Sequence, residues 1–203
     1  MWILIKPLVL KHKEGDSYKY LYYQFKRNPR IINPQLNATP HIKMDFNKLD
    51  AVIGNKNAEL TLTCVANTNC IHCSNTHRTI VKMMEKYPEK IKLIIRFMSS
   101  QTHNDEALHL LEVFRQNGSE TFEKAIQYWF KTNDYRKLKV EFPVKLISPE
   151  TIELLERQDK WCKLNNVTYT PTIFMNDKKV MKEYRIDDLK YLFDNLLRQV
   201  NVL

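Results

Sequence analysis

Apolar and polar positions follow a regular pattern only from about residue 59 onward. Residues 60–66 alternate β-branched and apolar side chains, which predicts a strand. Residues 67–69 interrupt it, and a helix is predicted from about residue 70, with Ile80, Met84 and Tyr87 on one stripe together with His77. Pro88 ends this helix, and residues 92–97 predict a second strand. The succession of strand, helix and strand indicates a βαβ unit.

A long helical pattern separates this unit from the next strand. Asn104 is expected to cap a helix that ends at Asn117 and Gly118. Ser119 is positioned to cap the following helix. Ser148, which precedes a proline, begins a third helix that runs to about residue 164. The sequence therefore predicts a helical insertion over about residues 100–165.

The C-terminal part returns to strands and closes with a helix. Residues 172–175 predict a strand, Asn176 and Asp177 a turn, and residues 178–182 a short partner strand. Asp187 is expected to cap a last helix whose leucines and Phe193 point inward. The order is βαβ, then helices, then ββα, which predicts an α/β domain over residues 51–203.

Residues 1–50 differ from the rest and are interpreted as an N-terminal arm or linker. Residues 17–27 are rich in tyrosine and predict a short helix, and Pro29, Pro34 and Pro40 then suggest an irregular stretch. Residues 2–10 are apolar but interrupted by Lys6 and Pro7, so they form neither a complete membrane span nor a convincing signal peptide. They suit either the end of a membrane segment or a buried N-terminal strand.

Composition and charge narrow the function classes. Hydrophobic residues make up 43% and charged residues 27%, as in globular proteins, and only 3 glycines argue against a glycine-rich nucleotide loop. The formal net charge is +9, with the basic excess concentrated in residues 1–50. That distribution favours an acidic membrane or partner over nucleic acid, and a solvated lysine-rich surface fits equally well.

The most informative motif is Cys70-Ile-His-Cys73, placed where a strand gives way to a helix. Free backbone N–H groups and the helix dipole stabilise a thiolate at a helix N-terminus and lower its pKa. Cys70 is nearer the open end and is expected to attack, whereas Cys73 is expected to resolve the mixed disulfide. His72 would stabilise the reduced state and so make the disulfide a stronger oxidant. The alternative is a surface histidine without a partner.

Other cysteine chemistry fits less well. Covalent haem attachment needs a histidine directly after the second cysteine, where this chain has Ser74. A metal site could use the pair with His77 and Cys64, but no second ligand pair follows at the usual spacing, so no metal is assigned. A purely structural disulfide and inert thiols are the other interpretations of the cysteine pair. Cys64 is predicted to be a small buried apolar residue, and a disulfide with Cys162 is a further possibility.

These elements resemble the thioredoxin superfamily, because Thr170 and Pro171 stand just before the third core strand. The resemblance implies a thioredoxin fold with a cis-proline against the cysteine pair and Thr170 and Pro171 contacting the substrate. The helical insertion and the Cys-Ile-His-Cys site are similar to the DsbA-like branch, although Ile71 replaces its proline. No acidic residue lies in the first strand, where thioredoxin carries a buried aspartate.

A finer resemblance concerns residues 69–77, Thr170-Pro171 and residues 184–189. Together they look like the thioredoxin-like domain fused behind vitamin K epoxide reductase-like membrane proteins of bacteria. This resemblance implies that residues 1–50 are juxtamembrane, that the domain lies on the periplasmic side, and that a membrane redox partner exists.

The sequence thus predicts a thiol–disulfide oxidoreductase that acts on cysteine-containing proteins or peptides outside the cytosol, with an oxidising role favoured. No bound cofactor and no nucleic-acid partner are expected, because the disulfide is itself the redox group. The alternatives are a thioredoxin-like binding or metal-binding module without catalysis, and a dedicated redox partner of one membrane enzyme.

Overall fold

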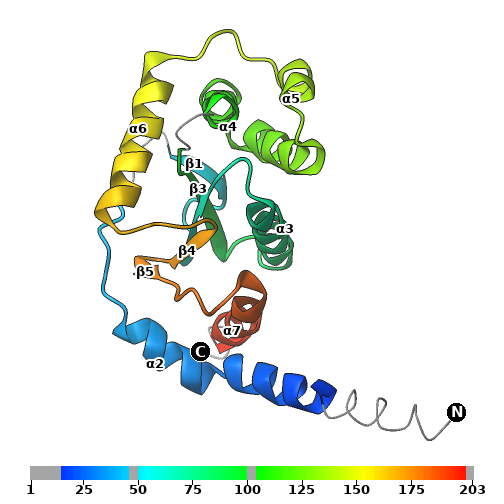
Figure 1. Ribbon diagram of the computed structural model, residues 1–203, viewed down its shortest axis with the longest axis vertical. Coiled ribbons are helices and arrows are strands. Elements are labelled where there is room, and N and C mark those ends of the chain that lie inside the picture. Colours follow the sequence, from blue (N-terminus) through cyan, green and yellow to red (C-terminus); the bar gives the residue numbers. More distant parts are fainter. Residues whose placement is uncertain (1–14, 46–49, 100–103, 200–203) are drawn as a thin grey trace, which may run out of the picture. The chain divides into compact units, whose positions relative to one another are not determined.

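A computed structural model of the chain describes residues 15–45, 50–99 and 104–199 (Figure 1). Within these residues the chain forms two compact units. One comprises residues 39–182 and holds the sheet, and the other comprises residues 15–38 and 183–199. The predicted apolar run at residues 2–10 lies outside the described residues.

The larger unit contains a five-stranded mixed sheet with the strand order β1-β3-β2-β4-β5. The strands are β1 (Ala51–Gly54), β2 (Leu60–Ala66), β3 (Ile91–Phe97), β4 (Thr172–Met175) and β5 (Lys178–Lys179). β2 and β3 run parallel, with Leu60 opposite Ile91 and Ala66 opposite Phe97. The other three pairings are antiparallel. The prediction of a βαβ unit followed by a β-hairpin is confirmed.

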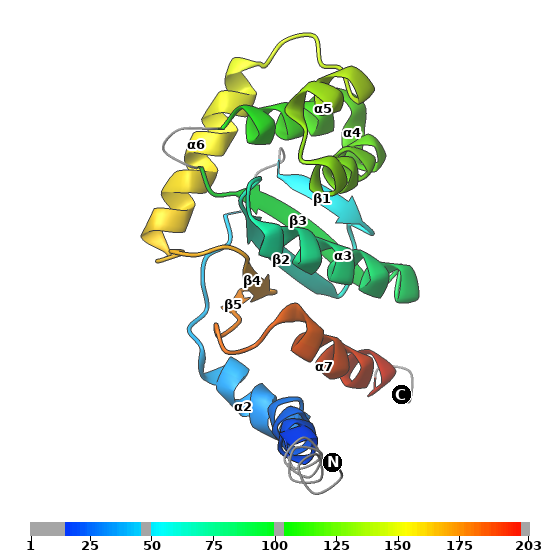
Figure 2. The ribbon, with the colours of Figure 1, turned by 45° about the vertical axis from the view of Figure 1, so that its right-hand side comes forward.

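Helices cover both faces of this sheet. The helices of the unit are α3 (Ile71–Lys86), α4 (Asp105–Thr132), α5 (Tyr135–Glu141) and α6 (Pro149–Leu164). α3 and α6 lie on opposite sides of the sheet (Figures 1 and 2). Nearly every residue of β2 and β3 is therefore buried, which explains why both strands read as largely apolar runs.

The helical insertion follows the prediction except at two caps and by one addition. Asn104 is the N-cap residue of α4, but its side chain makes no capping hydrogen bond, so that part of the prediction was wrong. Gly118 has a φ of 81° and a ψ of −173°, outside helical values, so the predicted end at Asn117 and Gly118 is confirmed as a break between two helical segments. Ser119 was predicted to cap the second segment, but its hydroxyl donates a hydrogen bond to the Val52 carbonyl of β1. α5 was not predicted, and it begins with the side chain of Asp134 accepting from the Lys137 backbone N–H.

Two strands differ from the prediction. β1 was not predicted because four residues show too little alternation, and it forms by pairing with the distant β3, with Ala51 opposite Ile95. The predicted partner strand over residues 178–182 is limited to Lys178 and Lys179.

The smaller unit is helical, and a charged cluster links its N-terminal and C-terminal parts. Residues 15–26 form a helix, as predicted for residues 17–27. The carboxylate of Asp188 lies 2.8 Å from Lys26 Nζ and 3.1 Å from Arg27 Nε, and it is buried. The Arg27 guanidinium also stacks on the rings of Tyr23 and Tyr191, 4.4 Å from each centroid. The N-terminal helix and the C-terminal helix thus share one polar cluster.

Two predictions for this unit were wrong. Residues 29–38, expected to be irregular, form α2 (Pro29–Ala38), because Pro29 stands at the first helical position, where its missing N–H costs nothing. The last helix, α7 (Ile186–Gln199), begins at Ile186, and Asp188 rather than Asp187 supports its start by accepting from the Arg185 backbone N–H at 3.1 Å.

Candidate active site

The two cysteines of the motif occupy the start of α3. Cys70 is the N-cap residue, with extended backbone angles, and its sulfur accepts a hydrogen bond from the Cys73 backbone N–H at 3.3 Å. The Cys70 N–H donates to the Asn67 carbonyl at 3.2 Å, which holds the preceding turn. Cys70 is half-buried and Cys73 is buried, and both are free thiols. The local sequence places the first thiol at the open helix end, as predicted.

The two thiols differ in acidity. Partial burial by itself would raise the pKa of Cys70, but hydrogen bonds from the side chains of Cys73 and Thr170 and from the backbone N–H groups of Cys73 and His72 outweigh it and lower that pKa. Burial raises the pKa of Cys73 far above its usual range, and the interaction with Cys70 adds to this. Of the two thiols, Cys70 is therefore the more readily ionised.

Thr170 and Pro171 lie against the cysteine pair. The Thr170–Pro171 peptide bond is cis, as the thioredoxin resemblance implied. The Cys70 sulfur is 3.5 Å from the Thr170 carbonyl oxygen. β4 begins immediately afterwards and pairs with β2, with Thr172 opposite Val65. The pairing of the two strands brings the loop before β4 to the end of α3, and with it a backbone carbonyl beside the reactive sulfur.

His72 is exposed at this site. Among the groups that lower the Cys70 pKa, His72 contributes through its backbone N–H. The effect of its imidazole on the redox potential therefore stays a prediction. Ile71, which replaces the proline of the DsbA-like branch, is 74% exposed and forms an apolar surface beside the thiols.

Three further residues support the site, and the sequence analysis did not assign them that role. The Trp129 indole of α4 donates to the Thr68 carbonyl at 2.9 Å, which fixes the loop before Cys70. The Ser74 hydroxyl donates to the Phe130 carbonyl at 3.4 Å, and the Asn67 amide donates to the Met98 carbonyl at 3.2 Å. The only sequence signal was that a buried indole N–H needs an acceptor.

The other two cysteines lie on opposite sides of the sheet. Cys64 of β2 is buried, and burial, with a smaller contribution from the charge of Cys70, raises its pKa to about 12. Cys162 of α6 packs in a cluster with Val65 and Phe174. Because consecutive strand residues point to opposite faces, Cys64 and Val65 face different layers, and no Cys64–Cys162 disulfide forms. The prediction of Cys64 as a buried apolar residue is confirmed.

In the described ranges, no group of three or more His, Cys, Asp or Glu side chains is arranged to hold a metal ion. None of the helices within those ranges has the length and apolar character needed to span a membrane.

Comparison with known proteins places the fold. A periplasmic thioredoxin-like protein from Salmonella enterica serovar Typhimurium superimposes with a TM-score of 0.66 at 16% identity, covering 76% of this chain and 94% of that one. Proteus mirabilis ScsC in a transitional conformation superimposes with a TM-score of 0.66 at 15% identity, covering 97% of this chain and 95% of that one. Oxidised BdbD from Bacillus subtilis superimposes with a TM-score of 0.63 at 18% identity, covering 79% of this chain and 97% of that one.

At these identities the likeness shows the fold alone, which is thioredoxin-like. A sequence comparison with curated proteins finds no match. A family model described as thioredoxin matches residues 46–195, a range that includes the sheet, the cysteine pair and the cis-proline. The chain therefore belongs to the thioredoxin family.

Proposed function

We propose that the chain is a protein thiol–disulfide oxidoreductase in which Cys70 and Cys73 form the redox pair. The observation that supports this most is the contrast between the two thiols. Cys70 lies at an open helix end beside the Thr170 carbonyl and has a lowered pKa, whereas Cys73 is buried and has a raised pKa. This is the asymmetry that separates an attacking thiol from a resolving one.

In the oxidising direction a substrate thiolate attacks the Cys70 sulfur of the Cys70–Cys73 disulfide. The S–S bond breaks, and Cys73 leaves and takes up a proton. A second substrate thiolate then attacks the substrate sulfur of the mixed disulfide and releases Cys70 as a thiolate. The substrate gains a disulfide, and the protein pair takes up two electrons. In the reducing direction the same steps run backwards, with Cys70 attacking and Cys73 resolving.

The oxidising direction is favoured on physical grounds. Hydrogen bonds that lower the Cys70 pKa stabilise the reduced protein and make its disulfide easier to reduce. Cys70 is then also the better leaving group when the mixed disulfide is resolved. A role outside the cytosol, on the periplasmic side, agrees with the Salmonella protein of the same fold, which is described as periplasmic.

The substrates proposed are cysteine-containing proteins or peptides. The backbone of Thr170 lies beside the Cys70 sulfur. We propose that an extended substrate segment pairs with this backbone like a strand and so presents its cysteine to Cys70. A membrane enzyme of the vitamin K epoxide reductase type is proposed as the partner that reoxidises the pair, on the basis of the sequence resemblance. Membranes carrying such an enzyme should then reoxidise the reduced protein, and failure to do so would remove this partner.

The test is trapping of the mixed disulfide. The Cys73→Ser variant is first treated with 5,5′-dithiobis(2-nitrobenzoate), which leaves Cys70 as a mixed disulfide with thionitrobenzoate. A reduced cysteine peptide should then displace thionitrobenzoate and accumulate as a covalent complex with Cys70, and dithiothreitol should release it. The Cys70→Ser variant is the matched control and should form none. Wild-type protein should also catalyse peptide oxidation in a glutathione buffer. Equal trapping by both variants, or no catalysis by the wild type, would contradict the proposal.

A further inference from the structure

A groove of about 660 Å³ runs along α3 on the side that faces the helical insertion. Its wall on α3 begins at Ser74, the residue after Cys73, and continues to Glu85. The opposite wall comes from the second segment of α4, and the last residue of α5, Glu141, and the following Phe142 close it. A helix rises about 1.5 Å per residue, so the groove is about 16 Å long, enough for about five extended residues.

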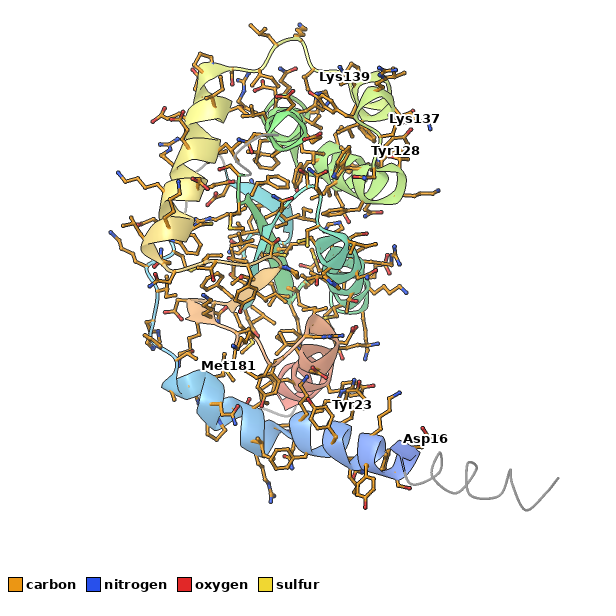
Figure 3. All side chains as sticks on the ribbon, viewed as in Figure 1. Asp16, Tyr23, Tyr128, Lys137, Lys139 and Met181 are labelled. Carbon is orange, nitrogen blue, oxygen red and sulfur yellow. The ribbon has the colours of Figure 1, made fainter. Side chains whose placement is uncertain are left out.

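The floor of the groove is apolar and aromatic. It is formed by Val81, Tyr128, Phe130 and Phe142. The rings of Tyr128 and Phe142 meet edge to face with centroids 5.7 Å apart. Figure 3 labels Tyr128 on the α4 segment that neighbours α5, with Lys137 and Lys139 on α5 itself. A floor of this kind accepts an aromatic or aliphatic side chain.

The rim of the groove carries an excess of positive charge. Arg78, Lys82 and Lys131 are exposed, and among the described residues none of the three forms an ion pair or a side-chain hydrogen bond. A fourth cation, Lys124, is already paired with Glu120 at 2.8 Å. Two carboxylates of the lining, those of residues 85 and 141, offset two of the three unpaired cations, so the net excess is one positive charge. The rim is complementary to a ligand with negative charges.

One buried polar atom in the lining is unused. His77 is 5% exposed, and its Nε2 has no hydrogen-bond partner within the described part of the chain. Its ring packs against Phe130, with centroids 5.6 Å apart. Burial lowers the pKa of His77 to about 4, so its imidazole is neutral at physiological pH. Unsatisfied buried polar groups are rare in proteins, which makes this nitrogen a candidate partner for a bound peptide group.

We propose that this groove binds an acidic segment of the protein substrate that contains an aromatic residue and lies near the reacting cysteine. The aromatic side chain enters the floor, and Asp or Glu residues pair with Arg78 and Lys82. The peptide is favoured over other anions because the groove continues directly from the redox helix. The inference rests on the proposed function for the identity of the substrate, but the binding itself requires no redox chemistry.

The test uses the full chain with Cys70→Ser and Cys73→Ser, which removes covalent exchange. A fluorescein-labelled peptide without cysteine, with one phenylalanine flanked by aspartates and glutamates, is titrated and followed by anisotropy. Its counterpart with lysines in place of the acidic residues is the control ligand. We expect the acidic peptide to bind at least tenfold more tightly. Equal affinity would overturn the proposal.

Variants locate the binding. The double variant Arg78→Glu with Lys82→Glu should bind the acidic peptide at least tenfold more weakly than the parent protein does, and it should bind the lysine peptide more tightly. Lys56→Glu with Arg136→Glu makes the same charge change outside the groove and should alter affinity less than twofold. Both pairs are exposed, and thermal unfolding verifies that they fold. Equal losses in the two double variants, or tighter binding of a single-stranded oligonucleotide of equal charge, would overturn the assignment.

Failure of this inference is separable from failure of the proposed function. Exchange with glutathione disulfide needs only the cysteine pair and should be unaffected by the groove variants. If the wild type exchanges with glutathione but does not distinguish the two peptides, the groove proposal fails alone. If the acidic peptide binds in the groove while no exchange occurs with any disulfide, the oxidoreductase proposal fails alone.

Discussion

Replacement of Glu112 by Gln tests how the helical insertion is held together. The Glu112 side chain on α4 is fully buried. One carboxylate oxygen accepts from Arg115 and Gln116 on the same helix. The other accepts from the Ser148 backbone N–H at 3.0 Å and from the Thr151 hydroxyl at 2.6 Å, at the start of α6. The carboxylate therefore joins two helices at the point where α6 begins.

The size of the effect follows from the pKa of Glu112. Burial alone would raise this pKa, but the hydrogen bonds from Arg115, Thr151, Ser148 and Gln116 outweigh burial and lower it from 4.5 to about 2. A shift of this size corresponds to about 3 kcal/mol in favour of the ionised carboxylate. Arg115 is partly exposed and screened by water. We therefore expect only about 2 kcal/mol of this free energy to contribute to folding stability.

The sign of the pH dependence follows from linkage. The pKa is lower in the folded state than in the unfolded chain, so the stabilisation is fully present above about pH 4.5. It is lost progressively as the pH falls from about 4.5 toward about 2. Glu112→Gln should therefore cost about 2 kcal/mol at pH 7, and its difference from wild type should shrink as the solution is acidified.

Urea unfolding of both proteins at pH 7, 5, 4 and 3 measures this difference. Glu153→Gln is the matched control, because Glu153 is exposed on α6 and lies 3.6 Å from Arg157, and it should change the free energy of unfolding by less than about 0.5 kcal/mol. The reasoning is refuted if Glu112→Gln is as stable as wild type at pH 7. It is also refuted if the difference between the two proteins is the same at pH 3 as at pH 7.

Three further predictions concern the site. Iodoacetamide below neutral pH should alkylate Cys70 of the reduced protein well before Cys73, because only the Cys70 pKa is lowered, and equal labelling rates would contradict the assigned roles. His72→Ala should lower the reduction potential by about 30–60 mV, because the loss of one charge-assisted contact of roughly 1.5–3 kcal/mol destabilises the reduced state. An unchanged or higher potential in a glutathione titration would leave the imidazole without a role. Trp129→Phe should cost about 1–2 kcal/mol in urea unfolding and slow peptide oxidation, because the Thr68 carbonyl loses its donor, whereas full stability and activity would show that this bond is dispensable.

Local patterns were sufficient for the elements that carry the chemistry. β2 and α3 were predicted nearly to the residue, because alternation, helical spacing and the stop at Pro88 act within a few residues of chain. The break at Gly118 followed from a residue type that readily adopts a positive φ. The roles proposed for Cys70 and Cys73 also follow from local structure, since a helix N-terminus acts on the thiol placed there.

Elements that depend on distant partners escaped sequence reasoning. β1 is only four residues long and exists by pairing with β3, whose register no local pattern encodes. Pro34 suggested an irregular stretch, yet Ile32 and Leu36, four residues apart, are buried on one side of α2. Burial of one helical face can outweigh the unfavourable propensity of a single proline.

The sequence by itself determined which residues can do chemistry, because thiol, imidazole and proline at given spacings have fixed local consequences. Only the tertiary structure decided what surrounds them. The pairing of β4 with β2 brings the Thr170 carbonyl to within 3.5 Å of the Cys70 sulfur, although 100 residues separate them. The alternation of β2 places Cys64 and Cys162 in different layers. The packing of the second α4 segment beside α3 creates the groove at His77, since a cavity arises from surfaces that meet in space and not from any one segment.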